Sequence, residues 1–95
     1  MRFEWDPKKA QRNLREHGVS FETATEVFYD DRRIESEDFI DENGEQRYQV
    51  IGMTQGLVLL LVAFVDRSDE NDVVIRLIHA RKAVAYESDQ YAAEG

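Results

Sequence analysis

Apolar and polar residues in the N-terminal third alternate with the spacing of two helices. Asp6-Pro7 is typical of a helix N-cap followed by proline, and His17-Gly18 is typical of a last turn closed by a left-handed glycine, so we predict a helix over residues 7–17. Ser20 can cap a second helix, because one apolar stripe follows it at helical spacing, formed by Phe21, Ala24, Val27 and Phe28. We expect this stripe to face the core.

The pattern then changes to that of strands. Residues 34–40 are charged and irregular, which favours a strand at the edge of a sheet, and residues 47–52 are typical of the strand that returns beside it. Between them, Asn43-Gly44 favours a type I′ turn with two residues of positive φ. The segment is therefore predicted to form a β-hairpin.

The rest of the chain predicts two further strands and a helix. Gln55-Gly56 indicates a second tight turn before the apolar run of residues 57–65, which suits a central strand covered on both faces. Residues 73–80 follow as the last strand and residues 82–91 as the last helix, while Arg2 to Trp5 could add a short first strand. The order predicts an α+β fold with a four-strand antiparallel meander.

Length and composition exclude several classes of protein. A chain of 95 residues suits one domain, residues 1–95. Without cysteine, and with only two histidines, we expect no disulfide, no metal site and no cofactor. The longest apolar run is about half of what a spanning helix needs, and the N-terminus lacks the apolar stretch of a signal peptide. We therefore expect a soluble, cytoplasmic protein that does not contact a membrane.

Charge is distributed unevenly along the chain. The formal net charge of −8 argues by itself against a phosphate-rich partner. Residues 30–46, however, hold eight carboxylates against Arg32 and Arg33, whereas residues 1–18 are about +2. The acidic stretch is interpreted as a solvated edge and turn, with a docking surface for a basic partner as the alternative.

The candidate chemistry lies in the last strand. Residues 76–82 contain two arginines, a histidine and a lysine, and Arg47 enters a neighbouring strand. Strict alternation places His79 and Arg81 on one face and Arg76 on the other, unless the strand bulges. Guanidinium groups on an open sheet face could hold RNA, and a histidine could transfer protons during attack by the 2′-hydroxyl, with no metal required.

Each of these residues also has a structural interpretation. His79 could be a half-buried structural histidine, and each arginine could pair with a carboxylate. His17 is expected to stabilise the end of its helix, and Asn13 to bind the backbone of a neighbouring loop. Two tyrosines of the last helix, Tyr86 and Tyr91, are expected to pack rather than react.

Several motifs resemble those of BrnT-type toxins. The opening is the specific part, with Phe3-Glu4-Trp5-Asp6-Pro7-Lys8-Lys9, Asn13 to Ala24 and Glu26-Val27-Phe28, and later motifs are Gly44-Glu45-Gln46-Arg47, Ile51-Gly52, and Ile75 to Ala83 with Glu87 and Tyr91. The resemblance implies a RelE-like, metal-independent ribonuclease that halts translation. It also implies a BrnA-type antitoxin, a small DNA-binding protein whose complex with the toxin represses their operon.

Residues and resemblance together select a candidate site. Its catalytic candidates are Arg47, Arg76, His79 and Arg81, and its RNA-binding candidates are Lys9, Arg67 and Lys82. Two features depart from the family. Members often carry serine where His79 stands, and their last helix is rich in arginine, whereas residues 83–95 contain no basic residue. The alternative function is a catalytically weak or inert binding module that modulates a DNA-binding partner.

Overall fold

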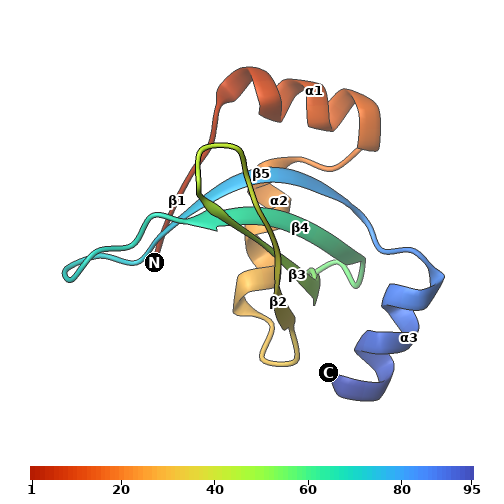
Figure 1. The fold of residues 1–95 in the computed structure, drawn as a ribbon. Coiled ribbons are helices and arrows are strands. Elements are labelled where there is room, and N and C mark those ends of the chain that lie inside the picture. The colour runs from red at the N-terminus through yellow and green to blue at the C-terminus, as the bar shows by residue number, and fades with distance from the viewer.

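A five-stranded mixed sheet organises the fold, with strand order β1-β5-β4-β3-β2 (Figure 1). The computed structural model describes residues 1–95. Strands β2 to β5 form the predicted antiparallel meander, and β1 adds to it in parallel with β5. The elements in chain order are β1 (Arg2–Glu4), α1 (Pro7–His17), α2 (Phe21–Ala24), the 3₁₀ helix η1 (Thr25–Tyr29), β2 (Ile34–Ile40), β3 (Gln46–Met53), β4 (Leu59–Asp66), β5 (Val74–Lys82) and α3 (Ala85–Glu94).

The first helix begins and ends where its capping residues predict. The Asp6 carboxylate accepts the Lys8 amide at 2.8 Å, and Gly18 has φ 70° and donates its amide to the Leu14 carbonyl. The second helix starts at the Ser20 cap but changes after one turn into η1. The predicted α+β fold is confirmed, with the second helix tighter in its second half than expected.

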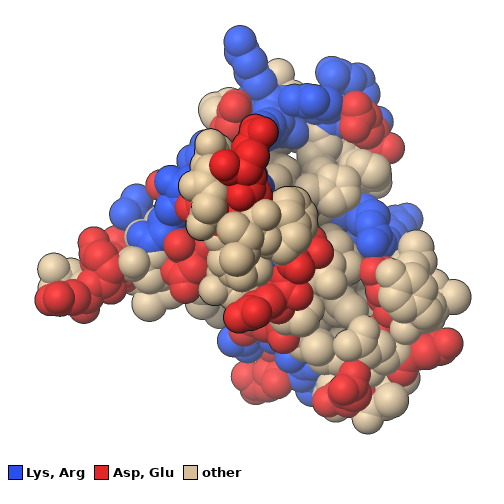
Figure 2. All heavy atoms as spheres, viewed as in Figure 1, with Lys and Arg blue, Asp and Glu red and all other residues tan.

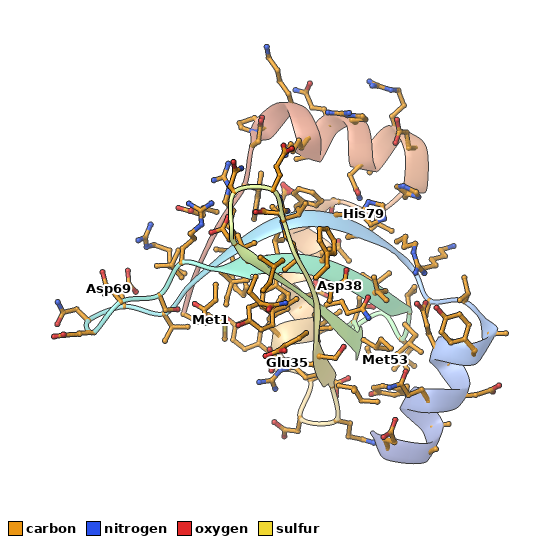
Figure 3. All side chains as sticks on the ribbon, in the orientation of Figure 1. Met1, Glu35, Asp38, Met53, Asp69 and His79 are labelled. Atoms are coloured by element: carbon orange, nitrogen blue, oxygen red, sulfur yellow. The ribbon has the colours of Figure 1, made fainter.

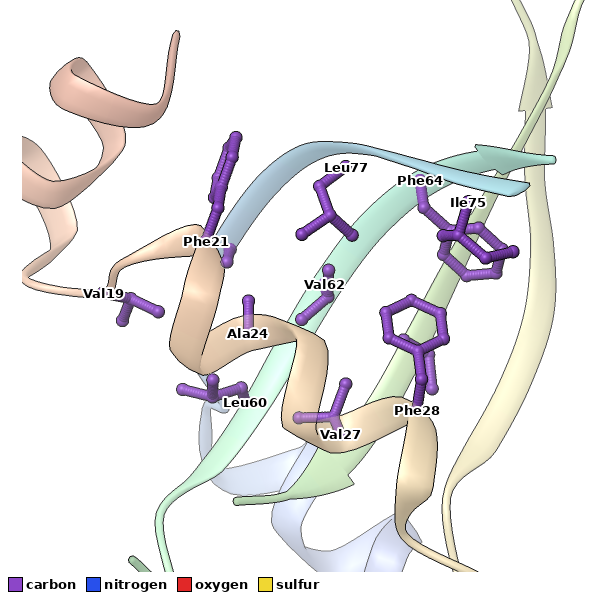
Figure 4. Close-up of a cluster of buried hydrophobic side chains, with 12 residues drawn as sticks. Val19, Phe21, Ala24, Val27, Phe28, Leu60, Val62, Phe64, Ile75 and Leu77 are labelled. Carbon is purple, nitrogen blue, oxygen red and sulfur yellow. The ribbon is translucent and has the colours of Figure 1, made fainter. Parts of the chain in front are cut away.

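The core lies between the sheet and the α2–η1 segment (Figure 4). The predicted stripe of the second helix is buried against Val62, Leu77 and Phe64, and Phe21, Ala24 and Val27 are fully inaccessible. Gly52 permits this close packing, because a Cβ there would lie 2.8 Å from the Cβ of Val27. This segment covers one face of the sheet.

Helix α3 covers part of the opposite face. Its Tyr91 packs against Ile51 of β3 and Leu61 of β4, which alternate with the core-facing Val50 and Leu60. The central strand β4 is thus covered on both faces at this end, as predicted. Tyr91 packs as expected, but the same expectation for Tyr86 is wrong, because that side chain is 70% exposed.

The first hairpin turn differs from the predicted type I′ turn. Only Gly44 has a positive φ, of 79°. The Asp41 carboxylate accepts the amides of Asn43 and Glu45, both at 2.9 Å, and the Asp41 amide bonds the Glu45 carbonyl. Aspartate therefore organises a longer loop, in which Asn43 does not need the left-handed conformation.

The second hairpin turn also differs from the prediction. Leu57, and not Gly56, takes the positive φ, of 63°. The Thr54 hydroxyl accepts the Val58 amide, so β4 begins at Leu59 instead of residue 57. At the same end of the sheet β5 is longer than predicted, because the Ala83 amide still bonds the Leu59 carbonyl. As a result β5 extends to Lys82 and α3 starts only at Ala85.

Candidate functional site

A bulge in β5 brings the basic residues of this strand to one face of the sheet. Ala63 of β4 pairs with His79, but the next residue, Phe64, pairs with Leu77, so Ile78 is an extra residue. Every second residue of β4 points to the same face of the sheet, and so do the β5 residues paired with them. These β5 residues are Arg76, His79 and Arg81. Strict alternation, which placed Arg76 on the other face, is therefore wrong here.

The other predicted cations of the sheet and its loops do not all lie on the same face as His79. Arg47 lies two residues before Gln49, the β3 partner of Ala63, so alternation places it on the same face, across β4 from Arg76. We call the side that carries Arg47, Arg76, His79 and Arg81 the arginine face. Arg67 lies beyond it, in the loop after β4, and the exposed Lys82 ends β5.

Arg81 is held by a carboxylate from α3. Its guanidinium donates two hydrogen bonds to Glu87, at 2.8 and 2.9 Å, and the Glu87 side chain is only 3% exposed. These bonds lower the pKa of the Glu87 carboxyl despite its burial, and the same carboxylate accepts the Val84 amide at the start of α3. Arg81 is thus bound in the geometry that a guanidinium also offers to phosphate.

Each remaining predicted arginine also has an acidic neighbour. These pairs are partly exposed, which leaves the guanidinium groups accessible but neutralised. Of the two interpretations given for these arginines, the structure therefore shows the pairing with carboxylates. The pairs are Arg47–Asp41 at 3.0 Å, Arg67–Glu45 at 2.9 Å and Arg76–Glu4 at 3.6 Å.

A hollow of about 230 Å³ between α1 and β5 is lined by charged groups and His79. We call it the α1–β5 hollow. It is lined by Lys9, Arg12, Asn13, Glu16, Ile78 and His79. Figure 3 shows His79 on β5, on the side of that strand toward α1. Neither Lys9 nor Arg12 forms an ion pair. The free positive charge next to His79 thus comes from α1.

Two imidazoles meet at the C-terminal end of α1. The rings of His17 and His79 lie edge to face with centroids 4.6 Å apart. Partial burial lowers the pKa of His79, and the neighbouring charges of His17 and Arg81 lower it further, while Glu16 opposes them. At neutral pH His79 is therefore an uncharged imidazole that can accept a proton.

The two signs of charge are unevenly distributed on the face shown in Figure 2, although neither region is free of the other sign. Lysine and arginine gather over α1 and near the end of β5, whereas carboxylates gather over the β2–β3 hairpin and α3. The carboxylates of β2 are exposed, as predicted for a solvated edge strand. The acidic total charge thus coexists with a basic region around the α1–β5 hollow.

Sequence reasoning missed part of this arrangement. Neither Arg12 nor Glu16 was predicted to belong to the site, and His17 was expected only to stabilise the end of its helix. For Arg12 and Glu16 the available signal was their helical spacing. Residues 9, 12, 13 and 16 lie at i, i+3, i+4 and i+7 and so share one helix face. Asn13 binds the Val19 carbonyl, which confirms its expected role, and it also binds β5.

The structure contains no group of three or more His, Cys, Asp or Glu side chains arranged to hold a metal ion. None of its helices combines the length and the apolar character that a membrane crossing requires.

Comparisons with known proteins identify the family. The structure is similar to the crystal structure of the Brucella abortus ribonuclease toxin BrnT, with a TM-score of 0.58 and 23% identity, over 90% of this chain and 99% of that chain. This likeness shows the fold. No curated protein matched the chain. Residues 5–87 match the family model described as "Ribonuclease toxin, BrnT, of type II toxin-antitoxin system", so the chain belongs to the BrnT family of ribonuclease toxins.

Proposed function

We propose that this chain is a metal-independent endoribonuclease whose reaction takes place at the α1–β5 hollow. The observation that carries the proposal is the contact between His17 and His79, 4.6 Å between ring centroids, beside the unpaired cations Lys9 and Arg12. Two imidazoles and a positive surface supply what cleavage by a neighbouring 2′-hydroxyl requires: a base, an acid and stabilisation of negative charge.

The two histidines have different roles in this proposal. His79, kept neutral by burial and by neighbouring positive charge, takes the proton of the 2′-hydroxyl. The 2′-oxygen then bonds to phosphorus, and the bond from phosphorus to the 5′-oxygen breaks. His17 acts as the general acid and gives a proton to that leaving oxygen. The products are a 2′,3′-cyclic phosphate and a free 5′-hydroxyl, so atoms and charge balance without an ion.

The cations bind the RNA backbone and the charge that develops on it. Lys9 and Arg12 line the hollow, and Lys82 lies at the end of the same strand as His79. Arg76 and Arg81 lie on the arginine face on either side of His79, where they stabilise the pentavalent phosphorane once a phosphate replaces their carboxylates. Arg47 and Arg67 contact RNA further from the reacting phosphate.

A second candidate function is a catalytically inert binding module. The ion pairs favour it, because Arg47, Arg67, Arg76 and Arg81 are each paired with a carboxylate. Helix α3 also lacks the basic residues that would contact phosphate. Under this function the chain holds a DNA-binding partner without binding RNA.

The partner of a type II toxin is its antitoxin, and we propose that it is of the BrnA type. Such a small DNA-binding protein would cover the basic region and repress the operon together with the toxin. Co-expression with the reading frame beside the gene, followed by co-purification, tests the partnership. Both candidate functions predict a complex, so this experiment does not separate them.

Toxicity on induction separates the two functions. Soluble wild-type protein should arrest growth and cleave transcripts, while His79→Ala should leave growth normal and the fold intact. In vitro, labelled single-stranded RNA should bind at low salt and dissociate steeply as salt is added, because binding releases counterions. Normal growth with intact transcripts, together with no RNA binding at low salt, would support the inert module.

A further inference from the structure

Asn13 connects α1 to β5 through its side chain. Its Nδ2 donates to the Ala80 carbonyl at 2.8 Å and to the Val19 carbonyl at 2.9 Å, and its Oδ1 accepts the Ala80 amide at 3.1 Å. The residue is 5% exposed and is the only buried residue of α1. Every polar atom of this buried amide is therefore bonded.

The edge of β5 explains why an amide is needed there. β1 pairs with β5 only along Val74 to Arg76, so the outer edge of β5 has no strand beyond that point. A carboxamide offers one donor and one acceptor in the arrangement of a peptide group. Asn13 thus takes the place of the missing strand at Ala80, and satisfies both of its backbone groups.

The position of this connection matters for the imidazole pair. Ala80 lies between His79 and Arg81, two residues after the bulge at Ile78. His17 follows Asn13 by four residues, which is about one helical turn, so both lie on the same side of α1. The hydrogen bonds to Ala80 hold that side of the helix against β5, where the two rings meet.

We propose that Asn13 is the positioning residue of this site, which sets the separation of His17 and His79 by clamping α1 to the backbone of Ala80. The inference rests on the proposed function for its catalytic consequence. The clamp and the contact between the two rings do not depend on the proposed function. Asn13 acts through the backbone of β5 and need not touch the substrate.

Three variants test the hydrogen bonds of the Asn13 side chain in different combinations. Asn13→Asp keeps the size and the acceptor for the Ala80 amide, but it loses both donated bonds and places a carboxylate against two carbonyl oxygens. Asn13→Ala removes all three bonds, and Asn13→Gln keeps the amide on a longer side chain. Gln11→Ala, on the exposed side of the same helix, is the matched control.

The first measurement uses the wild-type protein without RNA. Hydrogen exchange followed by NMR should show the Ala80 amide to be strongly protected, although it lies on a sheet edge beyond β1. Contacts between the ring protons of His17 and His79 should be visible. Exchange of Ala80 at the rate of an exposed amide would overturn the proposal even if no variant folds.

The second measurement follows the imidazoles and the reaction together. The charged groups facing His79 are Lys9, Arg12, Glu16 and His17 from α1 and Arg81 from its own strand. In folded Asn13→Asp and Asn13→Ala, the His79 titration should move toward that of a free histidine as α1 separates. Their kcat should fall by roughly 10²-fold with KM nearly unchanged, because small misplacements of catalytic groups are costly. Asn13→Gln should recover part of both properties.

The outcomes distinguish this inference from the proposed function. A folded Asn13→Ala with wild-type His79 titration, ring contacts and kcat would overturn the clamp. If wild-type protein does not cleave RNA but the variants still separate the rings, the proposed function fails and the structural inference holds. Gln11→Ala should match wild type in every measurement, and an equal effect there would also count against Asn13.

Discussion

Arg81 and Glu87 bind each other through two parallel hydrogen bonds, of 2.8 and 2.9 Å, at the junction of β5 and α3. The guanidinium thus presents to a carboxylate the same two donors that it would present to a phosphate. Because the Glu87 carboxylate is buried and also caps α3, the last helix and an RNA phosphate compete for Arg81. Under the proposed function, this contact should lower the affinity of the site for RNA.

Removal of the Glu87 charge should strengthen RNA binding. Glu87→Gln retains an oxygen for the Val84 amide but no longer neutralises Arg81. Affinity for single-stranded RNA at low salt should rise, and the dependence of log K on log salt should steepen by about 0.7, the value of one added phosphate contact. Glu94→Gln, an exposed change of equal charge in the same helix, is the control. Equal gains in both variants would mean that net charge alone is responsible.

The pH dependence of cleavage should report the lowered pKa of His79. A general base must be neutral, so kcat/KM should rise as pH increases through that pKa, with the midpoint of the rise below the ordinary histidine value of 6.5. Arg81→Ala removes one cause of the lowered pKa, so the rise should move to higher pH. Rates measured between pH 5 and 8 check this. A profile that Arg81→Ala leaves in place would argue against His79 as the base.

Tyr91→Phe should destabilise the protein most at neutral pH. Burial raises the pKa of Asp30, but hydrogen bonds from the Tyr91 hydroxyl, at 2.6 Å, and from two backbone amides outweigh it, so the pKa is lowered. A carboxyl with a lowered pKa contributes stability above its unfolded pKa and loses it as pH falls through the folded value.

The Tyr91→Phe cost should therefore be about 1 kcal/mol at pH 7, after allowance for solvent access, and smaller near pH 3. Urea unfolding at both pH values measures it. The Tyr29→Phe variant provides the control, because that side chain is exposed and should show no such difference. A Tyr91→Phe cost that is equal at both pH values would exclude the charged hydrogen bond as its source.

The elements of the fold were largely predictable because their signals are local. Asp6, Ser20 and Gly18 mark helix ends through bonds to residues a few positions away. The turns were less predictable, because a side chain outside the dipeptide decided each of them. Asp41 captures two amides in the first turn, and Thr54 captures one in the second. Such competition depends on atoms that a turn signature does not include.

The candidate site was predictable in composition but not in geometry. His79 and Arg81 were identified from their strand, yet the bulge that turns Arg76 to their face leaves no mark in the sequence. The contact of His17 with His79 joins residues 62 positions apart, and it depends on how α1 lies along β5. Ion pairing was equally non-local, since any of the 20 carboxylates could have reached an arginine.

Leu57→Gly and Gly44→Ala should change the stability of the protein in opposite directions. Both have left-handed backbone, with φ of 63° and 79°, but only glycine adopts it without steric cost. Because Leu57 is 81% exposed, Leu57→Gly loses little packing and should stabilise the protein by about 1 kcal/mol. Gly44→Ala should destabilise it by a similar amount, about 1 kcal/mol. Denaturant unfolding measures both, and destabilisation by Leu57→Gly would show that its side chain makes a needed contact.

The cations of α1 should account for a measurable share of RNA binding. Lys9 and Arg12 line the α1–β5 hollow without an acidic partner, so each can neutralise one phosphate. Lys9→Ala and Arg12→Ala should each weaken binding to single-stranded RNA and reduce the salt dependence of log K by about 0.7, and the double variant should lose about twice that. Lys8→Ala changes the charge equally but lies outside the hollow, so it should have a smaller effect. If all three single variants weaken binding equally, RNA is attracted by the helix as a whole and the hollow has no special role.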